Sequence, residues 1–195
     1  MIPAALDSVK LHRRRVHLDG VTYVALCVRP GGPTFEVQHG DGGATVASDG
    51  FGLQLLGQVC WAISHQQRAK SIAVIDIAPT DGGPAADAAP AGSIVIASDE
   101  LGLPTADALG ELVAKLPWAT ESEGTIKLVT RGFEPAITAA DRPRGADKAR
   151  TITSAGTAIM LSAPQEALAV WAVEIAKYGG KLAKAARDVV GVTLV

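Results

Sequence analysis

Aromatic residues and cysteines are scarce in this 195-residue chain. Aromatics make up 4% of it, against 48% for hydrophobic residues as a whole, and there are two cysteines. The core must therefore be built from many small contacts among Ala, Val, Ile and Leu. Two cysteines are too few for the disulfide framework of a small secreted protein, so we expect Cys27 and Cys60 to be reduced core thiols.

The chain also lacks an excess of one charge and a long apolar run. It has 18 Lys and Arg against 20 Asp and Glu, so no overall field attracts nucleic acid or anionic lipid. No run approaches the roughly 18 apolar residues of a membrane span, and the N-terminal stretch lacks the apolar region of a signal peptide. We predict a cytoplasmic protein that binds neither nucleic acid nor membrane.

Motifs for cofactor, metal or covalent chemistry are missing as well. The four histidines have no partners at metal-ligand spacing, the glycine pairs form no phosphate loop or dinucleotide fingerprint, and no nucleophile elbow is present. Cys60 and His65 share a predicted helix but point about 140° apart at roughly 100° per residue. They therefore cannot act as nucleophile and base. Because the metal and phosphate motifs are missing too, we predict no metal and no cofactor.

What the chain does contain is a β-rich start followed by alternating strands and helices. Residues 13–48 alternate as three or four antiparallel strands, with Asp19-Gly20 suited to a two-residue turn. Asp49 is placed to cap the next helix, and Gly179-Gly180 to end the last long one, before a short helical piece at 181–188. The pattern predicts helices over 50–70, 104–116 and 164–178, and strands over 71–78, 93–98, 124–132, 157–162 and 190–195.

These elements predict a single α/β (or α+β) domain over residues 1–195. It has an N-terminal antiparallel meander followed by strand-helix units around one mixed sheet. Two long polar segments, near 79–92 and 134–156, are expected to be mobile loops.

The basic cluster "KLHRRRVHL" at 10–18 is the most concentrated charge in the chain. On a strand its charges alternate between two faces. It is expected to be a solvated edge that resists aggregation. A local phosphate or partner patch is the alternative.

One face of the helix predicted over 50–70 is the leading candidate for a binding site. Gln58, Trp61, His65 and Arg68 fall on the side opposite Cys60 when the helix is drawn at its ideal period. A Trp ring offers flat apolar area and an Arg offers a bidentate fork for carboxylate. The alternative is that the meander or a loop covers this face, which would make Trp61 part of the core.

Three carboxylates are the candidates for catalysis. Asp76 interrupts an otherwise apolar strand, and a carboxylate buried there must be paired or protonated. Asp99 and Glu100 follow the strand 93–98 directly, at the kind of strand end where open α/β sheets place ligands. If Asp76 acted with Asp99 or Glu100 as acid and base, the groups would converge in one cleft.

We therefore predict a non-catalytic binding or accessory protein that holds a peptide, a partner protein or a small metabolite. The β-rich start supplies an edge for strand addition. One alternative is a small-substrate enzyme that uses Asp76 with Asp99 or Glu100. Another is a structural subunit of a homo-oligomer, and the helix over 164–178 could form a homodimer through Trp171 and Tyr178.

Overall fold

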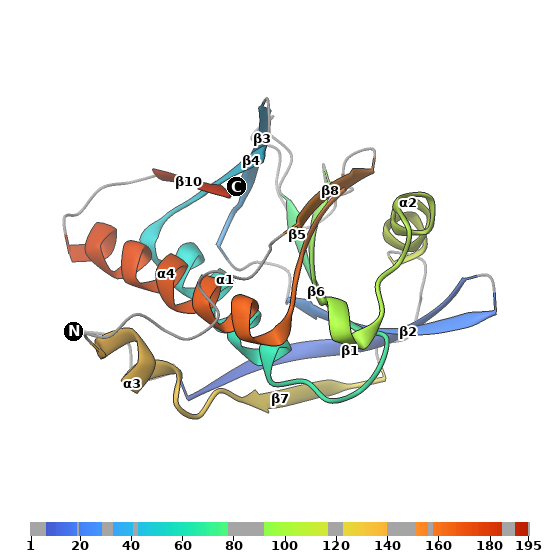
Figure 1. The fold of residues 1–195 in the computed structure, drawn as a ribbon, viewed down its shortest axis with the longest axis horizontal. Helices are drawn as coiled ribbons and strands as arrows, with labels where there is room; N and C mark the ends of the chain where they lie inside the picture. Colours follow the sequence, from blue (N-terminus) through green and yellow to red (C-terminus); the bar gives the residue numbers. More distant parts are fainter. Residues whose placement is uncertain are drawn as a thin grey trace.

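The computed structural model describes residues 7–18, 20–28, 33–40, 43–77, 92–116, 123–139, 151–155, 158–184 and 190–194. Within them lie a seven-stranded mixed sheet, a three-stranded antiparallel sheet and four α-helices (Figure 1). The predicted α/β architecture with a mixed sheet is confirmed.

The large sheet combines antiparallel pairs with two parallel ones. In spatial order its strands are β7 (Thr125–Val129), β1 (Ser8–Leu18), β2 (Val21–Val28), β5 (Ser71–Ile77), β6 (Gly92–Ser98), β9 (Ala158–Ala163) and β8 (Thr151–Ala155). β2 runs parallel to β5 and β6 runs parallel to β9. The central strands β5, β6 and β9 are apolar and almost wholly buried, as strands covered on both faces must be.

The predicted N-terminal meander divides between two sheets. β1 and β2 form the expected hairpin. β3 (Glu36–Gly40) and β4 (Gly43–Ser48) form a second hairpin, which pairs with β10 (Val190–Leu194) in the small sheet. The division follows because β1 occupies one side of β2 and the parallel strand β5 occupies the other, which leaves β3 no edge to join.

Helices cover the two faces of the large sheet unequally. α1 (Gly50–Ser64) and α4 (Gln165–Lys184) lie together on one face, with the short α3 (Phe133–Thr138) beside α4. α2 (Ala106–Lys115) lies on the other face, at the right of Figure 1. Asp49 caps α1 as expected, because its Oδ1 accepts a hydrogen bond from the Gly52 amide at 2.6 Å.

α4 continues through the glycine pair that was expected to end it. A Cβ on Gly179 would lie 2.8 Å from the Gly50 carbonyl oxygen and 2.9 Å from the Leu53 Cβ. The glycine therefore allows α4 to approach the start of α1 closely instead of ending the helix. The expected separate helical piece at 181–188 is, up to Lys184, the end of α4 itself.

Two further segments differ from the sequence pattern, and a third lies outside the described residues. α1 ends at Ser64 with His65 as its C-cap, so the predicted helix over 50–70 is about one and a half turns too long. The predicted loop near 134–156 contains most of α3 and all of β8. Residues 79–91 of the other predicted loop lie outside the described residues.

Candidate functional site

Both cysteines are chemically quiet. Cys60 lies on the inner side of α1 with no exposed surface, as the helix geometry predicts. Burial raises the pKa of Cys60 and of the half-buried Cys27 to about 12. Both thiols are therefore protonated at neutral pH and neither is a nucleophile.

Gln58 and Trp61, two of the four predicted binding residues, hold the turn that follows β7 against α1. The Gln58 side chain is buried, and its Nε2 donates to the Thr130 Oγ1 at 3.3 Å. The half-buried Trp61 ring lies 5.4 Å from the Phe133 ring, measured between centroids, and its Nε1 donates to the Arg131 carbonyl at 3.4 Å. Gln58 cannot meet a partner unless this turn moves.

His65 and Arg68 are the exposed members of the predicted set. The His65 ring lies 4.6 Å from the Trp61 ring, and its Nδ1 lies 2.9 Å from the Trp61 carbonyl oxygen. Nδ1 also lies 2.9 Å from the Ser64 Oγ, which itself donates to the Trp61 carbonyl at 2.8 Å. Arg68 lies beyond the end of α1, so the helical spacing that grouped it with Trp61 and His65 does not apply.

The three carboxylates do not converge, so the predicted acid–base pair is wrong. Asp76 lies opposite Ser93, at the start of β6, whereas Asp99 and Glu100 follow the end of that strand. Six residues of strand separate Ser93 from Asp99, which corresponds to about 20 Å at roughly 3.3 Å per residue. One small substrate cannot span that distance.

Asp76 has an unusual local environment, although its side chain is exposed. Partial desolvation raises the pKa of its carboxyl, while a hydrogen bond from the Ser93 Oγ, at 3.3 Å, and the nearby Arg14 charge act to lower it. The Arg14 side chain also donates from Nη1 to the Leu116 carbonyl at 2.6 Å, at the end of α2. Asp76 thus belongs to a small polar cluster in which none of the described residues supplies a second carboxylate.

Asp99 and Glu100 lie at the carboxyl end of β6, beside the start of α4. The Glu100 Oε1 accepts a hydrogen bond from the Gln165 amide at 3.4 Å, so this carboxylate already occupies the positive end of the α4 dipole. Desolvation and the Glu100 charge raise the pKa of Asp99, whereas a hydrogen bond with Ser162 lowers it. The two carboxylates make this corner acidic, and both accept hydrogen bonds from the protein itself. This disfavours the binding of an anionic ligand.

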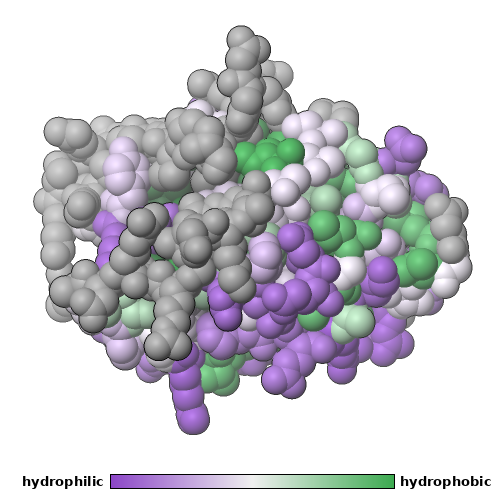
Figure 2. All heavy atoms as spheres, viewed as in Figure 1, coloured by the Kyte–Doolittle hydropathy of each residue, from purple (hydrophilic) through white to green (hydrophobic). Residues whose placement is uncertain are grey.

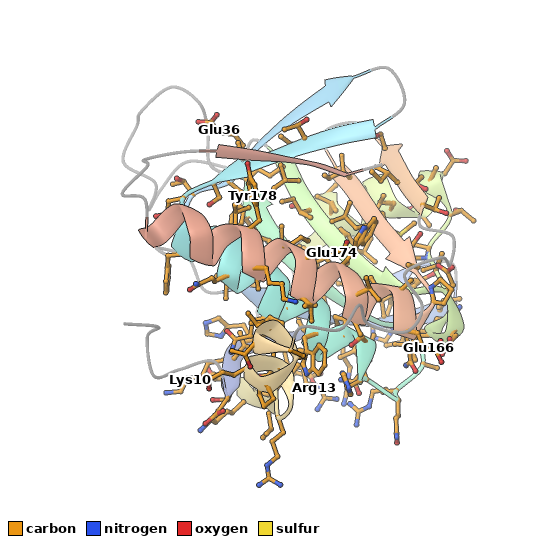
Figure 3. All side chains as sticks on the ribbon, turned by 60° about the vertical axis from the view of Figure 1, so that its left-hand side comes forward. Lys10, Arg13, Glu36, Glu166, Glu174 and Tyr178 are labelled. Atoms are coloured by element: carbon orange, nitrogen blue, oxygen red, sulfur yellow. The ribbon has the colours of Figure 1, made fainter. Side chains whose placement is uncertain are left out.

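Among the described residues, α2 covers only one end of its face of the large sheet. Under α2, the buried side chains of this face are apolar, namely Val16, Leu18, Tyr23, Ala25, Ile72, Val74, Val95 and Ala97. Alternation along β1 puts Lys10, His12 and Arg14 on the same face as Val16. Lys10 is exposed and extends to the outside of the molecule on the side away from α4 (Figure 3).

Strand β7 adds to this uncovered end of the face. Lys10 lies directly opposite Lys127, His12 opposite Thr125, and Ser8 opposite Val129. Lys127 and Thr125 are exposed, and Val129 is 61% exposed. Figure 2 shows hydrophilic residues gathered along the lower part of the molecule, where β7 and β1 run in Figure 1. We call the uncovered side chains of Lys10, Lys127 and Val129 the open face.

Lys127 and Val129 were not among the site residues predicted from the sequence. The signal was available in part, because "TIKLV" places Lys127 between two apolar positions as an edge strand does. The pairing of β7 with β1, however, joins segments more than a hundred residues apart, and one sequence does not reveal which strands pair.

No family model, curated protein or solved structure matches this chain. In the part of the chain that the structure describes, no group of three or more His, Cys, Asp or Glu side chains is placed to hold a metal ion. None of the helices within the described ranges is both long and apolar enough to cross a membrane.

Proposed function

We propose that the protein is a non-catalytic binding domain that holds an extended segment of a partner protein along the outer edge of β7. The observation that carries this proposal is the state of that edge: among the described residues no strand pairs with the outer side of β7, and Val129 is 61% exposed on it. Adding a strand to a free edge is a common mode of peptide recognition, because backbone hydrogen bonds supply the affinity.

The hydrogen bonds of β7 with β1 show which backbone groups are available. The Thr130 amide donates to the Asp7 carbonyl at 2.8 Å, and the Arg13 amide donates to the Gly124 carbonyl at 3.1 Å. In an antiparallel ladder, hydrogen-bonded pairs alternate with pairs that are not bonded to each other. The backbone groups of Ile126 and Leu128 therefore point to β1, and those of Thr125, Lys127 and Val129 point outward.

The two faces of an added strand would meet different surfaces. The half-buried Ile126 and Leu128 pack against the core on the side of α1 and α4. Alternate residues of a bound segment would extend that apolar layer, and the residues between them would lie beside the open face. Side chains on both faces of the bound segment would thus contact the protein.

The predicted binding residues take two roles in this proposal. Gln58 and Trp61 fix the turn at Thr130 and Arg131, and so position the end of β7. His65 is exposed beside Trp61, and Arg68 is exposed beyond the end of α1; both remain candidates for direct contact with the partner. We also keep the cytoplasmic location as a proposal, on the strength of the two reduced thiols.

The two alternative functions have less support. An enzyme using Asp76 with Asp99 or Glu100 requires groups that the sheet keeps about 20 Å apart. A homodimer through Trp171 is disfavoured because that side chain is 3% exposed. Tyr178 is partly exposed, but it points from α4 toward the small sheet (Figure 3).

A displayed library of random heptapeptides, selected on the full chain, tests the proposal. Val129→Pro removes one outward amide without breaking a bond to β1, whereas Val129→Thr keeps the amide and serves as the matched control. We expect selected peptides to bind the wild type and Val129→Thr and to lose binding to Val129→Pro, with circular dichroism showing that both variants fold. Selected peptides that bind Val129→Pro equally well, or no selection at all, would overturn the proposal.

A further inference from the structure

The basic residues of β1 differ between its two faces. Arg13 and Arg15 face the α1 side, where Glu123 pairs with both: the Arg13 Nε lies 3.2 Å from Glu123 Oε2, and the Arg15 Nε lies 3.0 Å from Glu123 Oε1. On the opposite face, Lys10 and Lys127 form no ion pair with any carboxylate of the described residues. Glu123 thus offsets part of the arginine charge on one face of β1, whereas among the described residues no carboxylate pairs with Lys10 or Lys127 on the other.

The two lysines are also placed where they repel each other most. Lys10 and Lys127 are directly opposite across β1 and β7. They belong to a pair that is not hydrogen-bonded to each other, and such pairs bring the side chains closest together. One lysine on an edge strand is enough to discourage aggregation. A second cation facing the first gives no further protection and instead favours an anionic group beside both.

We infer that the segment held at β7 is acidic, with carboxylates at two alternate positions that lie beside Lys127 and Thr125, and an apolar residue against Val129. This inference rests on the function proposed above. A strand paired with β7 places the residue opposite Lys127 about 5 Å away, and its diagonal neighbour about 7 Å away. Both carboxylates are then within reach of the long side chains of Lys127 and Lys10.

The size of the charged patch favours a peptide over nucleic acid. The positive row is short, it includes the exposed apolar side chain of Val129, and the whole chain carries a net charge of −2. A nucleic acid backbone needs a longer basic track with many phosphate contacts. A few carboxylates on an extended peptide match two lysines, and an apolar residue of the same peptide matches Val129.

Fluorescence anisotropy with a labelled, end-blocked hexapeptide, Val-Val-Glu-Val-Glu-Val, tests the inference. Its counterpart carries Gln in place of both Glu residues. We expect the Glu peptide to bind roughly two- to thirtyfold more tightly than the Gln peptide, the range that two exposed ion pairs supply. Lys10→Gln combined with Lys127→Gln should remove that preference. Lys115→Gln, a lysine change of the same kind on α2, should leave it intact.

The outcomes separate this inference from the proposed function. If the Gln peptide binds as tightly as the Glu peptide, and Val129→Pro abolishes the binding of both, the acidic preference is overturned and the edge function stands. If neither peptide binds the wild type, the inference fails, and the library selection decides whether the edge function fails with it. Tighter binding of a short single-stranded oligonucleotide, lost in the double lysine variant, would overturn the assignment to a peptide.

Discussion

The two ends of strand β1 differ in what covers them, although they lie on the same face of one sheet. Under α2, Val16 and Leu18 are buried against Leu112 and its neighbours. At the other end of β1, Lys10 is exposed and faces Lys127. The change from apolar to basic residues along β1 marks how far α2 reaches.

The largest expected effect on stability comes from a substitution at the end of the face that α2 covers. Leu112 has no exposed surface, so Leu112→Ala should lower the free energy of unfolding by about 2 to 5 kcal/mol through lost burial and a residual cavity. Urea denaturation followed by circular dichroism measures it. Lys10→Ala, at the open end of the face, should not destabilise the protein and should raise its stability by at most about 1 kcal/mol, because it removes the repulsion with Lys127. Equal losses of unfolding free energy in the two variants would contradict the difference in burial between the two ends of the face.

The next effect concerns the turn that positions β7. If Trp61 were only a surface contact, Trp61→Ala would weaken partner capture with little change in melting temperature. The contacts of Trp61 with Phe133 and the Arg131 carbonyl change that expectation. We now expect a loss of about 2 kcal/mol in unfolding free energy, measured by urea denaturation. His65→Ala, which removes only the exposed side of the ring stack, should cost less.

The lysine pair gives a smaller effect of opposite sign. Lys127→Gln removes the repulsion between directly opposed cations, so it should stabilise the free protein by about 0.2 to 1 kcal/mol. The gain should shrink as salt is added, because salt screens exposed charges. Thermal unfolding at low and at high ionic strength measures both. Destabilisation by Lys127→Gln would show that the pair is compensated in the folded protein.

The smallest effect concerns Asp76, the carboxylate on the α2 side of the sheet. Its raised pKa means that folding favours the protonated form, so the ionised carboxylate is destabilising at neutral pH. Asp76→Asn should therefore stabilise the protein at pH 7 and raise its melting temperature. Because the group is exposed, the gain in unfolding free energy should be well under about 1 kcal/mol. The difference from wild type should disappear as the pH falls toward the ordinary carboxylate range. A difference in melting temperature that stays constant across this pH range would show that ionisation of Asp76 is not its cause.

Local signals in the sequence predict much of the fold but not its long-range pairing. The cap at Asp49, the hairpin around Gly20 and the inward side of Cys60 follow from turn chemistry and helical period. Two features required contacts that periodicity does not encode: the small sheet, which joins β10 to β4, and the continuation of α4 through Gly179.

The candidate site was predicted less well, for a related reason. Trp61 was predicted to lie on the side of α1 away from Cys60. The Phe133 ring of α3 packs against it, and nothing near Trp61 in the sequence indicates that contact. Lys10 belonged to a recognised basic cluster. Its partner Lys127 became visible only when the sheet order placed β7 beside β1.

Residue-resolved amide hydrogen exchange of β7, with and without the Glu hexapeptide, tests the central claim most directly. In the free protein, the outward amides of Thr125, Lys127 and Val129 should exchange fast, and those of Ile126 and Leu128, bonded to β1, should exchange slowly. Binding should slow the three outward amides and leave the other two as they were. Outward amides that are unchanged at a saturating peptide concentration would contradict strand addition at β7.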